Sequence, residues 1–256
     1  MSTIHSTAIV DKDASLGKNV EVGPFSIIEK NVQIDDDTKI GSNVLIKNFT
    51  HIGKSCDIFN GAVIGEIPMD LKFEGEDSKI VIGDNTTIRE FCTLHRGTKD
   101  RGVTKIGSNC LLMSYAHVAH DVVIGDNVII SISVNIAGHA EIDDYAIIGG
   151  CTPIHQFCKI GKYAFIGGGR VILQDVPPYI LATGEPLKYA GINSVGLRRK
   201  NFNSDIIKTI KRAYSLIYQS KLNLSQAVEE IEQNFNLTGE VSEILDFIKR
   251  SDRGLI

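Results

Sequence analysis

The chain has 256 residues, of which 43% are hydrophobic, and a formal net charge of -4 at pH 7. This length and apolar content suffice for a sizeable core, and the negative charge argues against a general nucleic-acid-binding protein. The N-terminal MSTIHSTAIVDKD joins no basic start to an apolar run, and no stretch reaches the roughly 18 apolar residues of a membrane span. We therefore expect a cytoplasmic globular protein.

A period of six residues dominates the first two thirds of the sequence. From Ile4 to Ile172 in steps of six, 26 of 29 positions hold Ile, Leu or Val. The residue two positions earlier is small or β-branched, and a glycine often follows, where a turn would fall. One short strand and its corner cannot bury an apolar side chain alone, so the units must stack as coils. The pattern predicts a parallel β-helix over residues 1–180.

The three polar positions in this frame are Asp70, Glu76 and Asp100. They lie in two segments without the repeat, 65–79 and 95–105, which we expect to project as loops, where binding groups tend to lie. The five cysteines include no CxxC pair, so neither a disulfide framework nor a common zinc motif is indicated. Four cysteines take the inward small position and are expected to be buried core thiols: Cys56, Cys92, Cys110 and Cys158.

The repeat stops at QDVPPYI. Pro177 and Pro178 lack the N–H groups that a further strand needs, so we expect the prism to end there. Residues 181–256 are then predicted to form a small helical domain that covers the open end or a side of the prism.

Helical periodicity appears in this C-terminal part. Ser204 is the expected cap of a first helix, whose apolar residues recur at helical spacing. A second helix is expected at about 223–235, where Asn223 and Gln226 have the spacing of a capping box. A third is expected at about 240–250.

The six-residue unit resembles that of the hexapeptide-repeat transferases. The resemblance implies a prism with three units in each coil and a left-handed winding, whereas the general rule for parallel crossovers would predict a right-handed one. Equivalent residues of adjacent coils would then lie one strand spacing apart, about 4.8 Å.

Several histidines fall at the spacing of such coils. His120 and His139 are 19 residues apart, and His139 and His155 are 16 apart, so the three are expected near one another on one edge. Two chemistries could use that edge: zinc binding by neutral imidazoles, or general-base catalysis by one imidazole beside a carboxylate. Asp121 next to His120 favours the base, although their contact requires the corner to bend the backbone. The close spacing of His117 and His120, compared with the hexapeptide-repeat carbonic anhydrases, also favours it.

A more specific resemblance covers essentially the whole chain. The blocks IGEIPMDLKFEGE, TLHRGT, LLMSYAHVAHD, AGHAEIDDYAIIGG, HQFCKIG, QDVPPY and GINSVGLRRKNF occur in the order typical of the UDP-N-acetylglucosamine O-acyltransferases. The resemblance implies transfer of a 3-hydroxyacyl chain from acyl carrier protein to the sugar 3-hydroxyl, the first step of lipid A biosynthesis. It implies no metal, and no cofactor beyond the phosphopantetheine of the carrier protein.

The resemblance also assigns roles to residues. The second histidine of HxxHD, here His120, is the implied general base, Asp121 supports it, and the N–H of Gly138 is positioned to stabilise the developing oxyanion. The residues implied to bind substrate are Asp70, Lys72, His95, His117, His139, His155, Gln156, Asn193, Arg199 and Lys200. The family's site lies between subunits of a homotrimer, which implies that the loop residues come from a neighbouring chain.

Two positions suggest specificity. Val195 stands where relatives often carry an acidic residue, so a contact to the uridine ribose is expected to be missing or replaced. Gly168 matches the position that limits acyl length in the family, and its small size predicts a preference for chains of about fourteen carbons or more. Six cations form either a solvated face or a docking surface for the acidic carrier protein: Arg198, Arg199, Lys200, Lys208, Lys211 and Arg212.

Two alternatives remain open at this point. One is an N-acyltransferase acting on an amino-sugar nucleotide, including the enzyme that acts later in the same pathway and usually has an additional N-terminal domain. The other is a non-catalytic β-helix scaffold, which would need neither the histidine edge nor the basic cluster.

Overall fold

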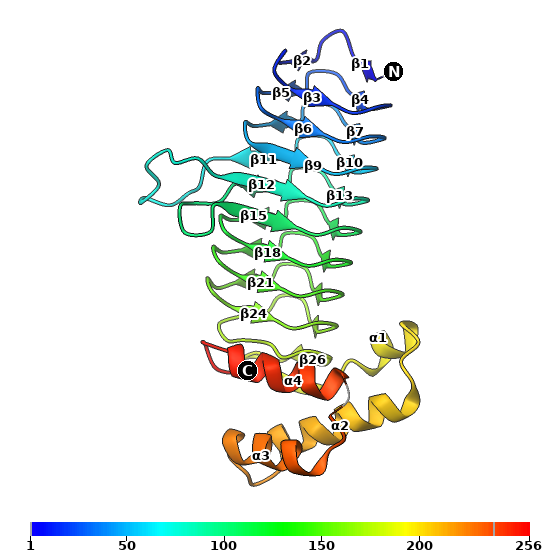
Figure 1. Cartoon of the computed structure of the whole chain (residues 1–256), viewed down its shortest axis with the longest axis vertical. Coiled ribbons are helices and arrows are strands. Elements are labelled where there is room, and N and C mark those ends of the chain that lie inside the picture. The colour runs from blue at the N-terminus through cyan, green and yellow to red at the C-terminus, as the bar shows by residue number, and fades with distance from the viewer. Residues whose placement is uncertain (1, 238) are drawn as a thin grey trace.

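The computed structural model describes residues 2–237 and 239–256. Over these residues the chain winds into a long three-sided prism, with the helices gathered at its C-terminal end (Figure 1). Each coil contributes one short strand to each side, so the described residues form three long sheets of eleven, eight and eight strands, named A, B and C below.

Sheet A contains β1 (Thr3–Ile4), β4 (Glu21–Val22), β7 (Lys39–Ile40), β10 (Asp57–Ile58), β13 (Thr87–Ile88), β16 (Leu111–Leu112), β19 (Ile129–Ile130), β22 (Ile147–Ile148), β25 (Phe165–Ile166), β26 (Ile180–Thr183) and β27 (Lys188–Ile192). Sheet B contains β2 (Ile9–Val10), β5 (Ile27–Ile28), β8 (Leu45–Ile46), β11 (Val63–Glu66), β14 (Thr93–His95), β17 (His117–Val118), β20 (Asn135–Ile136) and β23 (Pro153–Ile154). Sheet C contains β3 (Ser15–Leu16), β6 (Gln33–Ile34), β9 (Thr50–Ile52), β12 (Lys79–Ile82), β15 (Val103–Ile106), β18 (Val123–Ile124), β21 (Glu141–Ile142) and β24 (Lys159–Ile160).

The six-residue frame predicted from the sequence forms the core of the prism. From Val22 to Ile172, every apolar frame residue is buried, and strands of adjacent coils pair in parallel with these residues in register. Burial of an Ile side chain contributes about 2 kcal/mol, so stacking supplies the stability that one coil lacks. The four cysteines predicted to lie inward are buried, whereas Cys151 is exposed at a corner.

The corners of the prism use left-handed backbone conformations. One residue at most corners has a positive φ, and many of these residues are Asn or Asp, which tolerate that region best among residues with a side chain. Asp121 and His139 occupy such positions, with φ values of 58° and 63°. At these corners the side chains therefore do not point alternately to opposite faces, as they would in an extended strand.

Two loops leave the prism at the edge between sheets B and C, where Figure 1 shows them projecting to one side. Val63 pairs with Thr93, thirty residues later, where a regular coil takes eighteen, as between Val118 and Ile136. The segments outside strands are 67–78 and 96–102, shorter than the expected loops at 65–79 and 95–105, because strand pairing continues at their bases.

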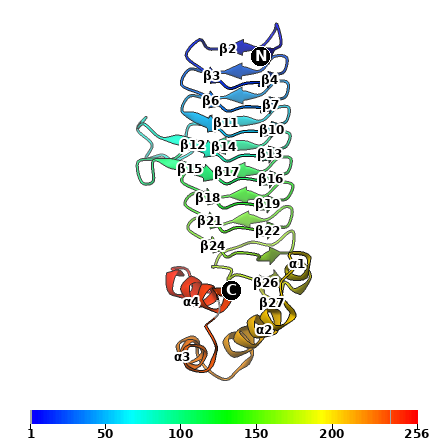
Figure 2. The same cartoon turned by 45° about the vertical axis from the view of Figure 1, so that its right-hand side comes forward.

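The expectation that the prism ends at Pro177 and Pro178 is wrong. Val176 still bridges to Ile160, and β26 pairs in parallel with β25 before β27 folds back antiparallel (Figure 2). The two prolines lie in the corner between these pairings, where no ladder hydrogen bond is required of their nitrogens. The ladder therefore crosses residue 180, the predicted domain boundary.

Four helices follow in the described residues: α1 (Ser194–Arg199), α2 (Ser204–Gln219), α3 (Leu224–Asn234) and α4 (Gly239–Arg250). The first of them was not predicted. Asn203, rather than Ser204, caps α2, since its side-chain oxygen accepts from the Asp205 N–H at 2.8 Å. The capping box of Asn223 and Gln226 at the start of α3 is confirmed.

The helices are attached to the last coils of the prism. The Tyr214 hydroxyl in α2 donates to the carbonyl of Pro178 at 2.6 Å, in a fully buried environment. Lys162 pairs with Glu243 in α4 at 2.8 Å. These contacts place the helical part over the C-terminal end of the coil, which is one of the two predicted positions (Figure 1).

Candidate active site

Many of the candidate site residues lie at the edge between sheets B and C. Both loops leave the prism at this edge, and the next two corners along it carry His120 with Asp121, and then His139. The loops and the imidazoles are far apart in the sequence, but the regular period of the coil places them on the same edge of the prism.

His120 and Asp121 form a hydrogen-bonded pair. The Nδ1 atom of His120 lies 2.9 Å from Oδ2 of Asp121, a contact between sequence neighbours that the left-handed backbone at Asp121 permits. The carboxylate side chain is fully buried, whereas the imidazole side chain is 15% exposed. The Asp121 carboxylate is thus buried behind the His120 ring, and this ring is accessible to a substrate.

The Asp121 carboxylate is held by residues that the sequence analysis did not single out. The N–H of Thr98 donates to Oδ1 and Oδ2 at 3.0 and 3.2 Å, and the Thr98 hydroxyl donates to Oδ2 at 2.6 Å. The backbone N–H of Asp121 donates to the Thr104 hydroxyl at 2.8 Å. Burial opposes ionisation, but the bonds from His120 and Thr98 outweigh it and lower the pKa of Asp121 to about 2.

This ionised carboxylate determines which nitrogen of His120 carries the proton. A carboxylate only accepts hydrogen bonds, so Nδ1 must donate, and Nε2 of the neutral ring is left unprotonated. The hydrogen bond to Asp121 raises the pKa of His120, with burial acting against it and the negative charge of Asp121 adding to it. The ring is therefore a stronger base than an ordinary histidine.

Gly138 lies directly against the base. A Cβ atom at this position would be 2.7 Å from both Cε1 and Nε2 of His120, so no larger residue fits without displacing the ring. Within the described residues the Gly138 N–H donates to no acceptor. Its bare backbone beside Nε2 agrees with the implied role as an oxyanion donor.

His139 belongs to the same cluster. Its ring meets that of His120 edge to face at a centroid distance of 5.1 Å and stacks on Phe157 at 4.6 Å. Its Nε2 lies 3.8 Å from a carboxylate oxygen of Asp121 and from one of Asp100. Burial and the nearby positive charge of His120 lower the pKa of His139, so it is the more readily neutral of the two rings.

His95 and His117 form a second pair on sheet B. Their rings meet edge to face at 5.1 Å, and Nδ1 of His117 lies 2.8 Å from the Thr93 hydroxyl. Burial lowers the pKa of both rings, and the positive charge of His120 lowers that of His95 further. His95, His117 and His139 are therefore more readily neutral than an ordinary histidine.

Loop 67–78 brings Asp70 toward the base. Within a single chain, the negative charge of Asp70 is among the causes that raise the pKa of His120. The Asp70 side chain also accepts from the Lys72 N–H at 3.0 Å, which closes a turn and leaves the Lys72 side chain exposed.

His155 and Gln156 are not drawn into the cluster. Both are exposed, and the one side-chain hydrogen bond of His155 among the described residues joins its Nδ1 to the Gln156 carbonyl at 3.1 Å. Gln156, rather than His155, occupies the corner position equivalent to Gly138 and His120, because adjacent coils align at intervals of 18 residues. The spacing of 16 residues from His139 leaves His155 out of register.

A metal ion is one alternative use of this cluster. His120, Asp121 and His139 each offer a ligand atom, and these atoms lie within 4.8 Å of one another. However, Oδ2 of Asp121 already accepts from His120 and from the Thr98 hydroxyl. A cation would have to replace these donors, so the donor set suits proton transfer better than metal binding.

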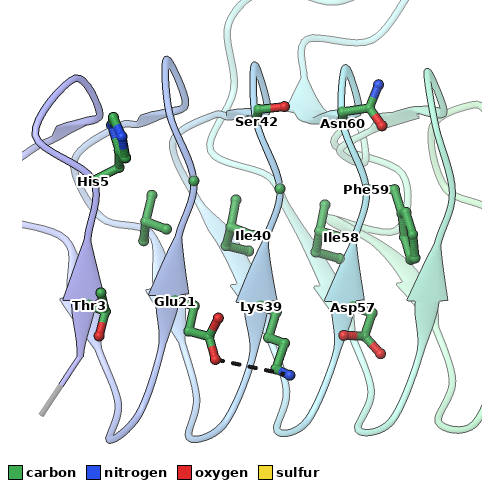
Figure 3. Close-up of a pocket in the computed structure, with 13 residues that line it drawn as sticks. Thr3, His5, Glu21, Lys39, Ile40, Ser42, Asp57, Ile58, Phe59 and Asn60 are labelled. Carbon is green, nitrogen blue, oxygen red and sulfur yellow. Dashed lines mark ion pairs between the residues drawn. The ribbon is translucent and has the colours of Figure 1, made fainter.

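A second hollow lies on the outer face of sheet A near the N-terminus. Its volume is about 500 Å³, and Figure 3 shows Glu21, Lys39 and Asp57 along its floor in register. Its imidazole, His5, is 3.0 Å from the Thr7 hydroxyl, and it has no carboxylate partner in the described residues. This hollow therefore offers no activated base.

Comparison with known proteins identifies the family. Two family models match, one described as UDP-N-acetylglucosamine O-acyltransferase domain 2 at residues 175–256, and one as bacterial transferase hexapeptide at 13–48 and 104–131. An acyl-[acyl-carrier-protein]–UDP-N-acetylglucosamine O-acyltransferase from Sulfurihydrogenibium is 59% identical, with 100% of this chain and 94% of the relative covered. The chain belongs to this O-acyltransferase family.

Other members agree with this assignment. The Aquifex aeolicus O-acyltransferase is 58% identical, with 98% of this chain and 97% of that protein covered. The solved structure of the UDP-N-acetylglucosamine acyltransferase from Bacteroides fragilis has a TM-score of 0.96 at 47% identity, with 98% and 99% of the two chains covered. The predicted fold, a left-handed parallel β-helix with C-terminal helices, is confirmed. In the described part of this O-acyltransferase chain, no helix combines the length and apolarity that a membrane crossing requires.

The residues implied to bind the nucleotide end lie elsewhere on the O-acyltransferase chain. Asn193, Arg199 and Lys200 line a pocket of about 380 Å³ on sheet A, together with Tyr145 and Val195. The ammonium of Lys200 lies 4.7 Å from the centre of the Tyr145 ring. The Asn193 side chain caps α1 and donates to the Tyr163 carbonyl, so its amide already has partners.

This pocket faces away from the histidine edge, because sheet A is the side of the prism opposite the edge between sheets B and C. Gly168 lies at a third place, the corner after β25, where a Cβ atom would be 3.0 Å from the Gly150 carbonyl oxygen. One chain therefore brings together His120, Asp121 and the other members of the histidine cluster, but not the predicted nucleotide and acyl-length residues.

Proposed function

We propose that this chain transfers an acyl group from acyl carrier protein to the 3-hydroxyl of UDP-N-acetylglucosamine, the first step of lipid A biosynthesis. The observation that carries the proposal is a buried carboxylate bonded to an accessible imidazole, His120, in a chain of the O-acyltransferase family. The relatives are named O-acyltransferases, which favours an oxygen acceptor over the amino-sugar and scaffold alternatives.

The proposed mechanism uses only groups of the site. Nε2 of His120 removes the proton of the sugar hydroxyl as its oxygen attacks the thioester carbonyl. Asp121 stabilises the resulting imidazolium, and the Gly138 N–H donates to the oxyanion of the tetrahedral intermediate. Collapse of the intermediate breaks the carbon–sulfur bond, and the thiolate of the carrier protein takes the proton back from His120.

Binding of the two substrates extends beyond this pair. We infer that the neutral histidines His95, His117 and His139, together with Asp70 and Lys72, contact the sugar and its phosphates, and that His155 and Gln156 extend this surface. The donor brings its own phosphopantetheine, so His120 and Asp121 need no further cofactor. Gly168 leaves space for a long acyl chain, and the exposed Val195 contributes an apolar wall where a charged contact to ribose would be absent.

A homotrimer is the arrangement that would complete the site. Within one chain the histidine edge and the pocket of Arg199 and Lys200 lie on different sides of the prism. A neighbouring copy would bring its sheet A pocket to the histidine edge. Arg198, Lys208 and Lys211 surround an adjoining hollow of about 560 Å³, and we infer that this basic surface docks the acidic carrier protein.

A transfer assay tests the function directly. Purified wild-type protein is given UDP-N-acetylglucosamine and 3-hydroxyacyl carrier proteins of several lengths, with divalent metals chelated. We expect transfer by the wild type and a loss of at least about a hundredfold in kcat for His120→Ala, the scale of a lost general base.

A matched control is available on sheet C. The Nε2 atom of His51 lies 3.0 Å from Oδ2 of Asp35, a second His–carboxylate pair that is partly exposed and lies on β9 and directly after β6, on sheet C rather than at its edge with sheet B. His51→Ala should retain wild-type activity. A wild-type enzyme without transferase activity, or an active His120→Ala variant, would contradict the proposal.

A further inference from the structure

Thr98 makes the densest set of contacts to the catalytic carboxylate. It is 4% exposed, and it supplies a backbone N–H and a hydroxyl to the two oxygens of Asp121, which lies 23 residues later in the chain. Oδ2, the oxygen that receives the Thr98 hydroxyl at 2.6 Å, is also the oxygen that faces Nδ1 of His120 at 2.9 Å. One carboxylate oxygen therefore joins Thr98 to the base.

The surrounding loop fixes the position of Thr98. The Gly102 N–H donates to the Thr98 carbonyl at 2.7 Å and closes a turn around it. Gly97 allows the close approach, because a Cβ atom there would be 2.5 Å from the Val103 nitrogen and 2.9 Å from Oδ1 of Asp121. The geometry at the base of loop 96–102 is thus specific for delivering Thr98 to the carboxylate.

The direction of the hydroxyl proton follows from its neighbours. The Asp100 N–H donates to the Thr98 oxygen at 3.3 Å, and ionised Asp121 can only accept. The hydroxyl hydrogen must therefore point to Oδ2 of Asp121. Thr98 acts as a fixed donor that completes a chain from the loop through the carboxylate to His120.

We propose that Thr98 is a positioning residue of the acyl transfer, which orients the Asp121 carboxylate so that Nδ1 of His120 is bound and Nε2 faces the acceptor hydroxyl. The proposal rests on the proposed function, and it adds a third member to the pair that the family resemblance implied. It also gives loop 96–102 a role in catalysis rather than only in binding.

The Thr98 hydroxyl and Nδ1 of His120 contact the same negatively charged oxygen, Oδ2 of Asp121. Two donors on Oδ2 spread its negative charge, so the Thr98 hydroxyl moderates the attraction of Asp121 for the imidazolium. The other groups that act on the charge of His120 are Asp70 and Asp100 from the two loops, His95 on β14, and His139 at the next corner, where Arg101 acts on His139 in turn. Loss of the hydroxyl should therefore change the titration of His120 while these charges stay in place.

The experiment replaces Thr98 by Val, which keeps the shape and the N–H but removes the hydroxyl. The titration of His120 is followed by NMR of the histidine side chains in the intact protein, and steady-state kinetics are measured beside it. We expect the pKa of His120 to rise, because Oδ2 becomes a stronger acceptor for Nδ1–H, and kcat to fall by about tenfold at unchanged KM. Thr98→Ser, which restores the hydroxyl, should resemble the wild type in both measurements.

Two controls separate this role from a structural one. Thr38→Val removes another fully buried threonine hydroxyl, which donates to the Gly53 carbonyl at 2.8 Å, and it should leave the His120 titration unchanged. Thr98→Ala removes the same hydroxyl without placing a methyl group against the carboxylate, and it serves if the valine variant does not fold.

The outcomes are distinct. A wild-type His120 titration in a folded Thr98→Val or Thr98→Ala protein, or a serine variant as altered as the valine one, would overturn the proposal. Because the titration needs no substrate, failure of the proposed function would appear separately, as a wild-type protein that does not transfer acyl groups.

Discussion

At the residue scale, the backbone conformation of Asp121 allows it to pair with His120, the proposed general base. Neighbouring residues of an extended strand face opposite sides, so His120 and Asp121 could not touch in a strand. The positive φ of Asp121 turns the carboxylate back to Nδ1 of His120. The buried carboxylate then remains ionised because Thr98 and His120 both donate to it.

Asp121→Asn should uncouple this pair. The wild-type kcat/KM should decline on the acid side through a pKa above the ordinary histidine value of 6.5, because His120 must be neutral to accept a proton and the bond to Asp121 raises its pKa. In the variant the negative charge of Asp121 no longer raises the pKa of His120, so the decline in kcat/KM should move to lower pH. The rate itself should fall at least about a hundredfold, since the amide no longer enforces the tautomer. A pH–rate profile of both enzymes tests this, and an unmoved acid limb would argue against Asp121 as the partner.

At the scale of elements, the residues of the proposed site lie mainly at corners, and the strands set the spacing between these corners. Successive corners between sheets B and C bear the loops and the imidazoles, whereas the corner after β25 is built from consecutive glycines, Gly167 to Gly169. At Gly168 an added Cβ would be 3.0 Å from the Gly150 carbonyl oxygen, so a larger side chain requires the neighbouring coil to shift slightly. The same type of element thus presents an imidazole at one edge and a side-chain-free corner at another.

Gly168→Leu should shorten the preferred acyl chain. The wild type is expected to favour donors of about fourteen carbons or more, and a side chain projecting from this corner would obstruct the end of such a chain. Turnover of donors with about ten carbons, relative to the long ones, should rise by about tenfold or more in the variant. Competition between donors of two lengths measures the ratio. A wild type that already prefers the short donor would refute the role of Gly168.

At the scale of the whole molecule, the predicted site is divided between two sides of one prism. His120 lies on the edge between sheets B and C, and the pocket of Arg199 and Lys200 lies on sheet A. A rigid prism cannot bend to join them, because its core is buried along nearly its whole length. A second copy, as in the proposed homotrimer, would place one beside the other.

Mixed oligomers test this division. His120→Ala and Arg199→Ala are each expected to be nearly inactive alone, and unfolding and refolding the two together should restore part of the activity. Recovery would arise because some interfaces combine an intact His120 from one copy with an intact Arg199 from another. Refolding each variant separately is the control. No recovery in the mixture would show that each site draws both residues from the same chain.

Much of this architecture follows from the sequence by itself. A six-residue spacing of Ile, Leu and Val leaves one way to bury every apolar side chain, so the prism, its buried cysteines and the shared edge of His120 and His139 were predictable. Tertiary structure alone decided the rest. Thr98 reaches Asp121 across 23 residues through a non-repeating loop, and β26 adds a strand beyond two prolines. A period determines which residues align between coils, whereas contacts made by loops and chain ends depend on backbone turns that have no period.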